Sequence, residues 1–456
     1  MAFLETLALP QAGRYWLRRA RVPTCFFATP APGALLDADG AALVDLLIDG
    51  ERVGAIEAAG TDLASELPAA DLAGRHVWPA LIDMHAHIDK GHVIPRIINS
   101  DGSFAGARDA TTADRSRHWS AEDVERRMRF ALRCAYAHGV TAIRTHIDSH
   151  EGSAATSWGV FRAMRERWAD RIALQAVSLV PIDAFRTPYA AKLADLVADS
   201  GGVLGGVTRA TGGVHSALLE DIDDLLDAVF RIAADRGLDV DLHVDESGDP
   251  EAAALPRVAR AILRNRFKHH VVCGHCCSLA LQPEERVRET LALCAEAGVS
   301  VVTLPTVNLY LQDRVAGRTP RWRGVTLIKE MRRAGIPVAV GGDNCRDPFY
   351  AYGDHDMVDN LRQAIKIAHL DHPLGDVPAM VGPTPAAIIA VAPLGRIAVR
   401  GPAKLIMFSA RTLNELVCRP QSDRIVLDRG RRILDGLPDY SELDETARVL
   451  DDTCDA

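Results

Sequence analysis

The sequence predicts an α/β protein whose core is a (β/α)8 barrel, with a small β-sandwich module built from both chain ends. Two observations predict this fold. After residue 79, eight apolar, strand-like runs alternate with amphipathic helical patterns, as expected for a closed parallel barrel. No G-x-G-x-x-G turn follows the first run, which disfavours a dinucleotide-binding sheet. The predicted boundaries are 79–393 for the barrel, and 1–78 with 394–456 for the β module.

Short strand-like runs separated by turn residues occupy the two chain ends. Asp49-Gly50 is a typical hairpin turn between two of them. Asp435–Ala456 is polar and acidic, so we expect it to fray. The strands expected for the β module are Tyr15–Leu17, Ala42–Ile48, Arg52–Ile56, Arg396–Val399, Lys404–Phe408, Arg424–Leu427 and Arg432–Leu434.

The barrel region has a strand and helix pattern along its whole length. Helices are expected at Ala121–Ala137 and Ile222–Asp235, where apolar residues recur at helical spacing. The uncharged run Val377–Gly395 contains four prolines, which indicates buried loop and helix rather than a membrane span. The eight expected strands are Val77–Ile82, Thr141–His146, Ala173–Val180, Gly202–Val207, Val240–His243, His270–His275, Ser300–Leu304 and Pro337–Gly341.

Composition excludes several classes of protein. A chain that is 48% hydrophobic can bury a large core, which excludes disorder. With 61 acidic against 52 basic residues and no Lys/Arg run, nucleic acid is not expected as a partner. The nine cysteines are unevenly placed and indicate reduced, buried thiols of a cytoplasmic protein. Met1–Pro10 lacks the basic start of a signal peptide, and no membrane partner is expected. A homo-oligomer is compatible with a chain of this size.

Histidines stand at the ends of several predicted barrel strands. His85 and His87 follow the first strand two residues apart, so both imidazoles can face one point. His146, His243 and His275 end the second, fifth and sixth strands, and Asp343 follows the eighth. A lone His-x-His is more often structural, and a lone strand-end aspartate is usually a helix cap. Together, on the face where barrel enzymes carry out catalysis, they predict a metal site.

Imidazoles with one carboxylate suit Zn²⁺ or Fe²⁺, whereas Mg²⁺ and Ca²⁺ prefer oxygen ligands. Such an ion would supply a metal-bound hydroxide at neutral pH. No lysine ends the fourth strand, so one metal ion is expected rather than two. Cys273 and Cys276 form a C-x-x-C, but no second pair follows, so buried thiols are favoured over a zinc knot. Cys345 is expected beside the pocket, without a base to make it a nucleophile.

Five segments resemble the amidohydrolase superfamily, and within it the cytosine deaminase-like branch. They are Asp83–Lys90 (DMHAHIDK), Arg144–Asp148 (RTHID), Asp241–Glu246 (DLHVDE), Gly274-His275 and Asp343, and the narrower placement also uses Val307–Gln312 (VNLYLQ), Arg321–Val325 (RWRGV) and Asp347–Tyr350 (DPFY). The resemblance covers about Pro79 to Pro393. It implies the barrel with its flanking β module and a metal-dependent hydrolase.

The resemblance also implies roles for single residues. The metal ligands would be His85, His87, His243 and Asp343, and His275 would hydrogen-bond the bound water. Glu246 would protonate a ring nitrogen and help ammonia leave, while Asp343 accepts the proton of the attacking water. The competing interpretation of Glu246, a carboxylate at a helix start, is weaker beside His243.

Two departures from cytosine deaminase bear on the substrate. The segment Leu179–Ile182 has no amide side chain to bind a pyrimidine edge, and Asn344 replaces a second aspartate. Cytosine itself is therefore disfavoured, because unpaired polar groups discriminate strongly between substrates. Phe349 keeps a flat heterocycle plausible. The residues expected to contact it are Asn344, Phe349, Pro181 and His146, and Arg209 or His215 is either a further contact or a solvated loop residue.

These observations predict a metal-dependent hydrolytic deaminase that acts on a C–N bond of a small nitrogen heterocycle or cyclic amidine and releases ammonia. One alternative is release of an alkylamine, as in N-isopropylammelide hydrolases. A second alternative is hydrolysis of a cyclic amide. A third is a non-catalytic binding relic, which the intact ligand set and Glu246 disfavour.

Overall fold

The computed structural model describes residues 3–29, 33–62 and 66–447, and the chain divides into two compact units. Unit 1 comprises Met1–Asp83, Cys134–Ala142 and Asp356–Leu437. Unit 2 comprises Met84–Arg133, Ile143–His355 and Pro438–Ala456. Within the described residues, no helix is long and apolar enough to span a bilayer.

Each of the eight expected barrel strands has a counterpart in the structure. The first differs most from its prediction. Val77–Pro79 (β5) pairs antiparallel with a strand near the C-terminus, and the expected barrel strand begins only after Ala80. The counterparts are β6 (Leu81–Ala86), β7 (Val140–Asp148), β8 (Ala173–Leu179), β9 (Leu204–Val207), β10 (Val240–Val244), β11 (Val271–His275), β12 (Ser300–Thr303) and β13 (Val338–Val340).

These strands form two sheets whose order follows the chain. One sheet has the order β6-β7-β8, and the other runs from β9 to β13 with every neighbouring pair parallel. Isolated parallel bridges join Val177 to Val203, just before β9, and Ala86 to Asp343, just after β13. The carboxyl ends of consecutive strands therefore lie at one edge of each sheet.

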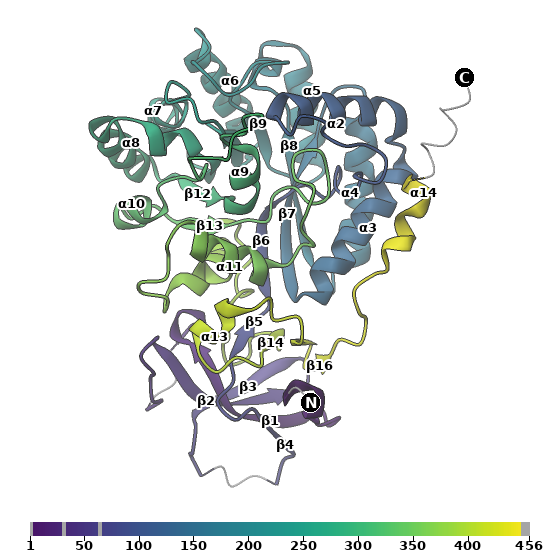
Figure 1. The fold of residues 1–456 in the computed structure, drawn as a ribbon, viewed down its shortest axis with the longest axis vertical. Coiled ribbons are helices and arrows are strands. Elements are labelled where there is room, and N and C mark those ends of the chain that lie inside the picture. Colours follow the sequence, from purple (N-terminus) through teal and green to yellow (C-terminus); the bar gives the residue numbers. More distant parts are fainter. Residues whose placement is uncertain (1–2, 30–32, 63–65, 448–456) are drawn as a thin grey trace. The chain divides into compact units, whose positions relative to one another are not determined.

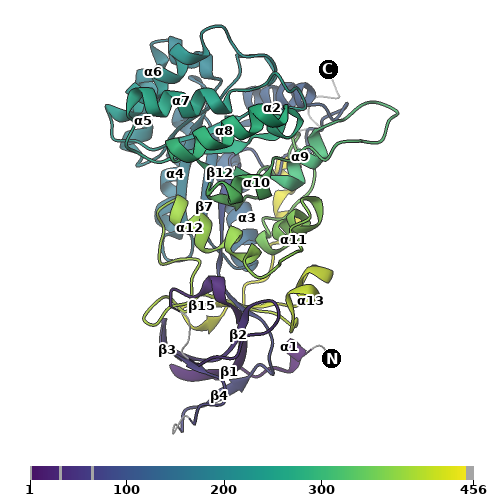
Figure 2. The ribbon, with the colours of Figure 1, turned by 90° about the vertical axis from the view of Figure 1, so that its left-hand side faces the viewer.

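Helices follow the strands and lie outside them (Figures 1 and 2). The predicted helix Ala121–Ala137 (α3) is confirmed with the same bounds, and the predicted Ile222–Asp235 ends one residue earlier as α6 (Ile222–Ala234). The other helices up to residue 333 are α2 (Phe104–His118), α4 (Ala154–Trp168), α5 (Tyr189–Asp199), α7 (Leu255–Asn265), α8 (Glu284–Ala297), α9 (Pro305–Leu311) and α10 (Ile328–Arg333).

Unit 1 contains two antiparallel-rich sheets. The predicted hairpin at Asp49-Gly50 is confirmed, because β2 and β3 pair antiparallel with Asp49 opposite Arg52. The predicted strand Arg396–Val399 is wrong: Ile397 makes only an isolated bridge to Phe27. One sheet has the order β3-β2-β1-β4 and the other β16-β15-β14-β5, with β1 (Arg14–Pro23), β2 (Ala41–Asp49), β3 (Arg52–Ala58), β4 (Ala69–Asp71), β14 (Leu405–Met407), β15 (Ile425–Asp428) and β16 (Arg431–Arg432).

Aromatic side chains form part of the core of unit 1. The ring of Trp78 lies 5.2 Å from that of Phe26 and 5.3 Å from that of Phe408, and all three side chains are buried. The short helices of this unit include α11 (Met357–Ile367), α12 (Pro383–Ile388) and α13 (Leu413–Cys418), and one begins the chain, α1 (Phe3–Thr6). As predicted, Val377–Gly395 is loop and short helix.

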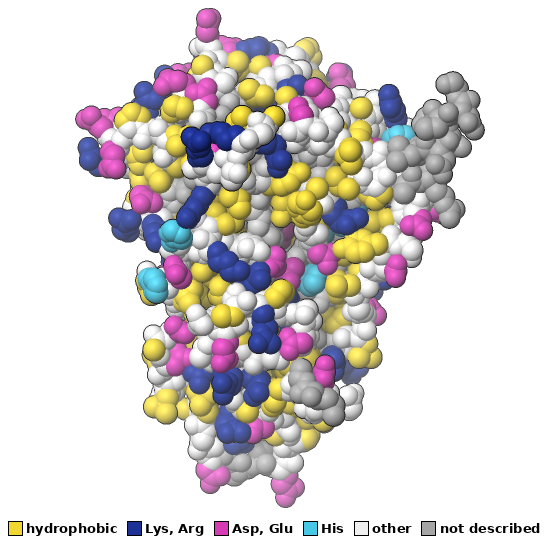
Figure 3. All heavy atoms as spheres, in the orientation of Figure 1, with side chains coloured by type: hydrophobic (Ala, Val, Ile, Leu, Met, Phe, Trp, Pro, Cys, Tyr) yellow, Lys and Arg dark blue, Asp and Glu magenta, His cyan; other side chains and the backbone are white. Residues whose placement is uncertain are grey.

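The expected fraying of Asp435–Ala456 is wrong for its described part. Tyr440–Leu443 and α14 (Asp444–Ala447) are helical, Leu443 is buried, and Glu442 pairs with Arg133. Packing against α3 thus overrides the polar composition of this segment. Residues 448–456 lie outside the described part. On the face drawn in Figure 3, acidic and basic side chains are interspersed.

Candidate metal centre and active site

The side chains predicted to hold a metal come from the carboxyl ends of the strands. β6 carries His85, with His87 one residue beyond its end, and β10 carries His243. Asp343 follows β13 in the left-handed backbone region, with φ 66°, and its N–H donates to the carbonyl of His85 at 2.6 Å. The strand-end backbone therefore turns the Asp343 carboxylate towards the histidines.

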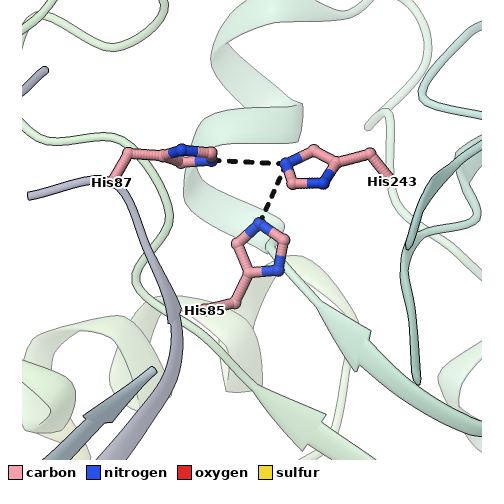
Figure 4. Close-up of side chains that lie close together, drawn as sticks. All are labelled: His85, His87 and His243. Carbon is pink, nitrogen blue, oxygen red and sulfur yellow. Dashed lines mark hydrogen bonds between the residues drawn. The ribbon is translucent and has the colours of Figure 1, made fainter. Parts of the chain in front are cut away.

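The three imidazoles converge through their Nε2 atoms (Figure 4). Nε2 of His243 lies 3.2 Å from Nε2 of His85 and 3.3 Å from Nε2 of His87. Oδ1 of Asp343 lies 3.2 Å from Nε2 of His87 and 3.7 Å from Nε2 of His85. None of these four residues is more than 5% exposed.

This arrangement fits a metal ion better than a set of hydrogen bonds. Neutral imidazole Nε2 carries at most one proton, so His243 can donate to only one of the two nitrogens that it faces. Four ligands about 2.0–2.1 Å from a tetrahedral ion have their nitrogens about 3.3 Å apart, which is the spacing found here. Burial lowers the pKa of His85, His87 and His243 and keeps the rings neutral, the form that binds metals.

His275 and Glu246 lie beside this cluster. The side-chain amide of Asn308 donates to Nδ1 of His275 at 2.9 Å, which leaves the ring proton on Nε2. Oε1 of Glu246 lies 3.5 Å from the same Nδ1. Burial, followed by the charge of Asp343, raises the pKa of Glu246 well above its usual 4.5, which favours the protonated form of this side chain.

A cavity of about 400 Å³ opens onto the cluster. Its volume lies within the usual range for small-molecule sites. Glu246, His275 and Asp343 form one part of the wall, and Val180, Pro181, Val207, Phe104 and Phe349 provide apolar surface. A cavity that combines this apolar surface with a carboxyl group and a metal-binding cluster can hold a flat heterocycle with its reacting carbon beside that carboxyl group.

Three of the four predicted substrate contacts line this cavity, and His146 does not. Asn344, Phe349 and Pro181 are wall residues. His146 is fully buried, with its ring 4.0 Å from that of His85, behind the metal-binding histidines.

The structure also distinguishes between Arg209 and His215, the two candidates for a further contact in the loop after β9. Arg209 lines the cavity, and its guanidinium lies 5.4 Å from the ring centre of Phe104. His215 is buried, with its ring 6.2 Å from that of Phe104, and it is not a wall residue. Of the two residues, only Arg209 is therefore placed where it could contact a ligand in the cavity.

Sequence reasoning missed a charged cluster in the cavity wall. Asp148, at the end of β7, lies 3.5 Å from Nζ of Lys90 and 2.8 Å from the guanidinium of Arg115. Lys90 in turn lies 4.9 Å from the centre of the Phe349 ring. The signal available in the sequence was the pair of strand-end motifs HIDK and THID, whose polar residues beyond the histidines were not considered.

The cysteines behave as buried thiols. Cys273, Cys276 and Cys277 are fully buried and make no disulfide, and no metal-binding group among the described residues includes them. Cys345 is also buried, but it is not a wall residue of the cavity, contrary to the expectation from its place beside Asn344. The backbone turns after Asn344, and Arg346 has φ 52°.

Comparisons with known proteins identify the family of this chain. Residues 97–427 match the amidohydrolase family, so the match begins after the His-x-His motif. A pterin deaminase of Rhizobium rhizogenes is 50% identical over 439 residues, which cover 95% of this chain and 97% of the relative. An N-isopropylammelide isopropyl amidohydrolase of Pseudomonas sp. is 26% identical, covering 69% of this chain and 74% of the relative.

A solved structure supports the fold. The 5-methylcytosine deaminase of Klebsiella pneumoniae, liganded with 5-fluorocytosine, superposes with a TM-score of 0.76 at 22% identity, covering 92% of this chain and 97% of the other. This likeness assigns a TIM-barrel-like α/β fold. The chain therefore belongs to the amidohydrolase family, as a hydrolytic deaminase that cleaves a carbon–nitrogen bond of a nitrogen heterocycle.

Proposed function

We propose that this enzyme deaminates a pterin, replacing the amino group of the 2-amino-4-oxopteridine ring by oxygen. The observation that carries the proposal is the 50% identity to a pterin deaminase over nearly the full length of both chains. The wall of the cavity is compatible with it. Leu179, Val180 and Pro181 offer apolar surface where a pyrimidine-reading amide would stand, and a bicyclic ring needs more such surface than cytosine does.

The ligand cluster prepares the attack on the ring. His85, His87, His243 and Asp343 would hold one divalent ion, Zn²⁺ or Fe²⁺, which supplies hydroxide near neutral pH by lowering the pKa of a bound water to about 7. With the ion bound, the Asp343 carboxylate would be the group that accepts a proton from the attacking water. His275, with its proton on Nε2, donates a hydrogen bond to the attacking oxygen.

Glu246 completes the proton transfers. Its carboxylic acid donates a proton to the ring nitrogen next to the amino-bearing carbon, which makes that carbon a better electrophile. After attack, the proton taken up by Asp343 would reach the amino group through Glu246, and the C–N bond would break to release ammonia. The other proton of the water, released to solvent, balances the proton that Glu246 takes back from solvent to complete the cycle. Phe349 stacks on the ring, while Asn344 and Arg209 hydrogen-bond its polar edge.

The experiment that tests the reaction compares Glu246→Gln with Glu251→Gln, an exposed glutamate on the same loop. In E246Q we expect kcat/KM to fall by about 10²–10⁴-fold while the metal content stays unchanged, because the acid is lost and the ligands are not. E251Q should match the wild type. Unchanged turnover in E246Q would remove the proposed proton donor.

The substrate is tested with pterin, cytosine and N-isopropylammelide, and with separate detection of ammonia and isopropylamine. We expect ammonia from pterin with the highest kcat/KM of the three. Release of isopropylamine as the main activity would favour the alkylamine alternative instead. Turnover of cytosine but not of pterin would contradict the proposal.

The finer architecture is part of the proposal. We infer that the eight strands close into one (β/α)8 barrel, because isolated bridges join β8 to the start of β9 and the end of β6 to Asp343. We also infer that residues 1–78 and 394–456 build one β-sandwich module beside a barrel of residues 79–393. In support, both of these chain ends contribute strands to unit 1, although that unit also contains Asp356–Ile367. A cytoplasmic location and assembly as a homo-oligomer stay predictions.

A further inference from the structure

A second group of metal-ligating side chains lies outside the catalytic cluster. His92 follows β6, Cys345 follows Asp343 by two residues, and His355 ends the same loop. All three are buried, with exposures of 0%, 3% and 6%. Their ligand atoms lie within 4.8 Å of one another, and Nε2 of His92 is 3.2 Å from Nε2 of His355. The proposed reaction uses none of these three residues.

The backbone holds the three side chains in place. The N–H of His92 donates to the carbonyl of Cys345 at 3.1 Å, and the N–H of Val93 donates to the carbonyl of Arg346 at 3.0 Å. His92 and His355 have φ values of 62° and 56°, a region that non-glycine residues rarely adopt. Such conformations persist only where the surroundings determine them, and they gather at functional sites.

A hydrogen bond between two imidazoles accounts for only part of this arrangement. Such a hydrogen bond explains the 3.2 Å contact between the two Nε2 atoms, but it does not explain why a buried thiol lies beside them. The spacing equals that of the catalytic histidines, 3.2 and 3.3 Å, and it is the spacing expected for two ligands of a tetrahedral zinc ion, about 3.3 Å. Gly353, with φ 94°, packs against this thiol: a Cβ there would lie 3.4 Å from Sγ of Cys345, an ordinary van der Waals contact.

Two cations near the group, Arg346 and Arg127, have partners of their own. Arg127 is paired with Asp123 at 2.8 Å, and the guanidinium of Arg346 lies over the ring of Tyr440 at 4.4 Å. A thiolate would offset part of the charge of a divalent ion in this buried place.

We propose that His92, Cys345 and His355 bind a zinc ion at a structural site separate from the catalytic cluster. Two imidazoles and a thiolate are ligands that zinc prefers. Asp354 adjoins His355 in the chain, but it is not among the side chains whose ligand atoms lie within 4.8 Å of one another, so a further ligand would complete the coordination. The ion would fasten the segment that carries Lys90 to the segment that carries Asp343 and Asn344, two parts of the active-site wall that are otherwise joined there by backbone hydrogen bonds.

Metal analysis of the full chain purified from zinc-supplemented cells tests the site. We expect two zinc ions per wild-type chain and one per chain in Cys345→Ser. The matched control is Cys294→Ser, a buried free cysteine on α8, which should keep two ions. His243→Ala should lose the catalytic ion and keep the ion bound through Cys345, which separates this proposal from the proposed function.

Cobalt substitution gives a spectroscopic readout in the wild-type protein itself, so the main test does not require a variant to fold. The wild-type protein loaded with Co²⁺ should show a thiolate-to-cobalt charge-transfer band, which His92→Gln should weaken and C345S should abolish. If the wild type binds a single ion and shows no thiolate band, the site does not exist and the group is a hydrogen-bonded pair beside a thiol. Two ions in C345S would also overturn the proposal.

Discussion

Asn308 sets the tautomer of His275. Its amide donates to Nδ1 at 2.9 Å, so the other ring nitrogen, which has no hydrogen-bond partner among the described residues, carries the proton. Asn308 lies on α9 and is not a wall residue of the cavity, so it acts through His275 as a positioning residue. The sequence contained this asparagine within VNLYLQ, but no local pattern connects it to a histidine 33 positions earlier.

Replacing Asn308 by Asp tests this positioning role. A carboxylate accepts the proton of Nδ1 instead of donating to it, so Nε2 no longer donates from a neutral ring. We expect kcat to fall by about 10–100-fold, a usual cost for a lost partner of this kind, with little change in KM and no change in metal content. A rise in KM at constant kcat would contradict the role, because it would place Asn308 in substrate binding.

Phe349 is predicted to hold the substrate by stacking. Its ring lines the cavity and lies 5.4 Å from the ring of Phe104 in an edge-on arrangement. Phe349→Leu keeps an apolar side chain but loses the aromatic face, which contributes about 0.5–1.5 kcal/mol, so KM for pterin should rise by roughly 2–10-fold. Phe349→Tyr should stay near the wild type. Steady-state kinetics of both variants decide the matter, and equal KM values for F349L and the wild type would exclude stacking.

At the scale of elements, a glycine in β9 allows β8 and β10 to approach β9 closely. A Cβ on Gly205 in β9 would lie 2.4 Å from the carbonyl oxygen of Asp241 and 2.6 Å from that of Ser178. Backbone atoms of neighbouring strands cannot yield as a flexible side chain can. Alanine at this position would therefore push the strands apart near the edge that carries His243.

Two glycine-to-alanine substitutions, one in β9 and one in a helix, are expected to change the free energy of unfolding in opposite directions. Gly205→Ala should lower the free energy of unfolding by about 3 kcal/mol or prevent folding. Gly159→Ala, in α4, has no atom within 4 Å of the new Cβ and should raise it by about 1 kcal/mol, because alanine favours helix. Denaturant unfolding measures both values. A neutral G205A would mean that the strands have more room than the structure shows.

How well an element was predicted depends on what its buried face contains. The helix α3 was predicted with its observed bounds because Val124, Met128 and Leu132 form an apolar stripe. The preceding helix α2 has no such stripe: its buried residues are Ala107, Thr111 and Asp114. Asp114 is buried because Arg96 pairs with it at 2.7 Å, a tertiary contact that hydropathy cannot reveal.

The candidate site was predictable to the same extent. Strand-end histidines are a regular pattern, because parallel strands end at one edge, and His85, His87 and His243 do meet. The pattern does not tell which way each side chain points. His146 was expected to end its strand, but β7 continues to Asp148, and the ring of His146 packs 4.0 Å from that of His85 rather than in the cavity wall. Lys90 was missed for the related reason that its partner Asp148 is supplied by another strand.

At the scale of the whole molecule, buried histidines make stability depend on pH. Nine of the 16 histidines have a lowered pKa, which means that the folded protein binds fewer protons than the unfolded chain below about pH 6.5. Buried carboxyl groups act in the opposite direction: burial raises the pKa of Asp347 to about 6. A single variant away from the catalytic cluster isolates one such contribution.

His76, in unit 1, provides that variant. Burial lowers its pKa from 6.5 to about 4, and its Nδ1 accepts a weak hydrogen bond from the indole N–H of Trp78 at 3.4 Å. Because the folded pKa lies below the unfolded one, the stability from neutral His76 is complete above about pH 6.5. It falls as the pH drops from 6.5 towards 4, since only the unfolded chain takes up the proton there. One pKa unit corresponds to about 1.4 kcal/mol, so the titration of this residue alone should lower the free energy of unfolding by about 2 kcal/mol between pH 7 and pH 5.

His76→Asn keeps a hydrogen-bond acceptor near the Nδ1 position and removes the titrating group. We expect the variant to be less stable than the wild type at pH 7, because the smaller side chain leaves unfilled space in a buried place. Between pH 7 and pH 5, however, it should lose about 2 kcal/mol less free energy of unfolding than the wild type does. Urea unfolding of both proteins at the two pH values measures the difference. Equal losses in the two proteins would mean that His76 is protonated in the folded protein at pH 5, and therefore that its surroundings admit water.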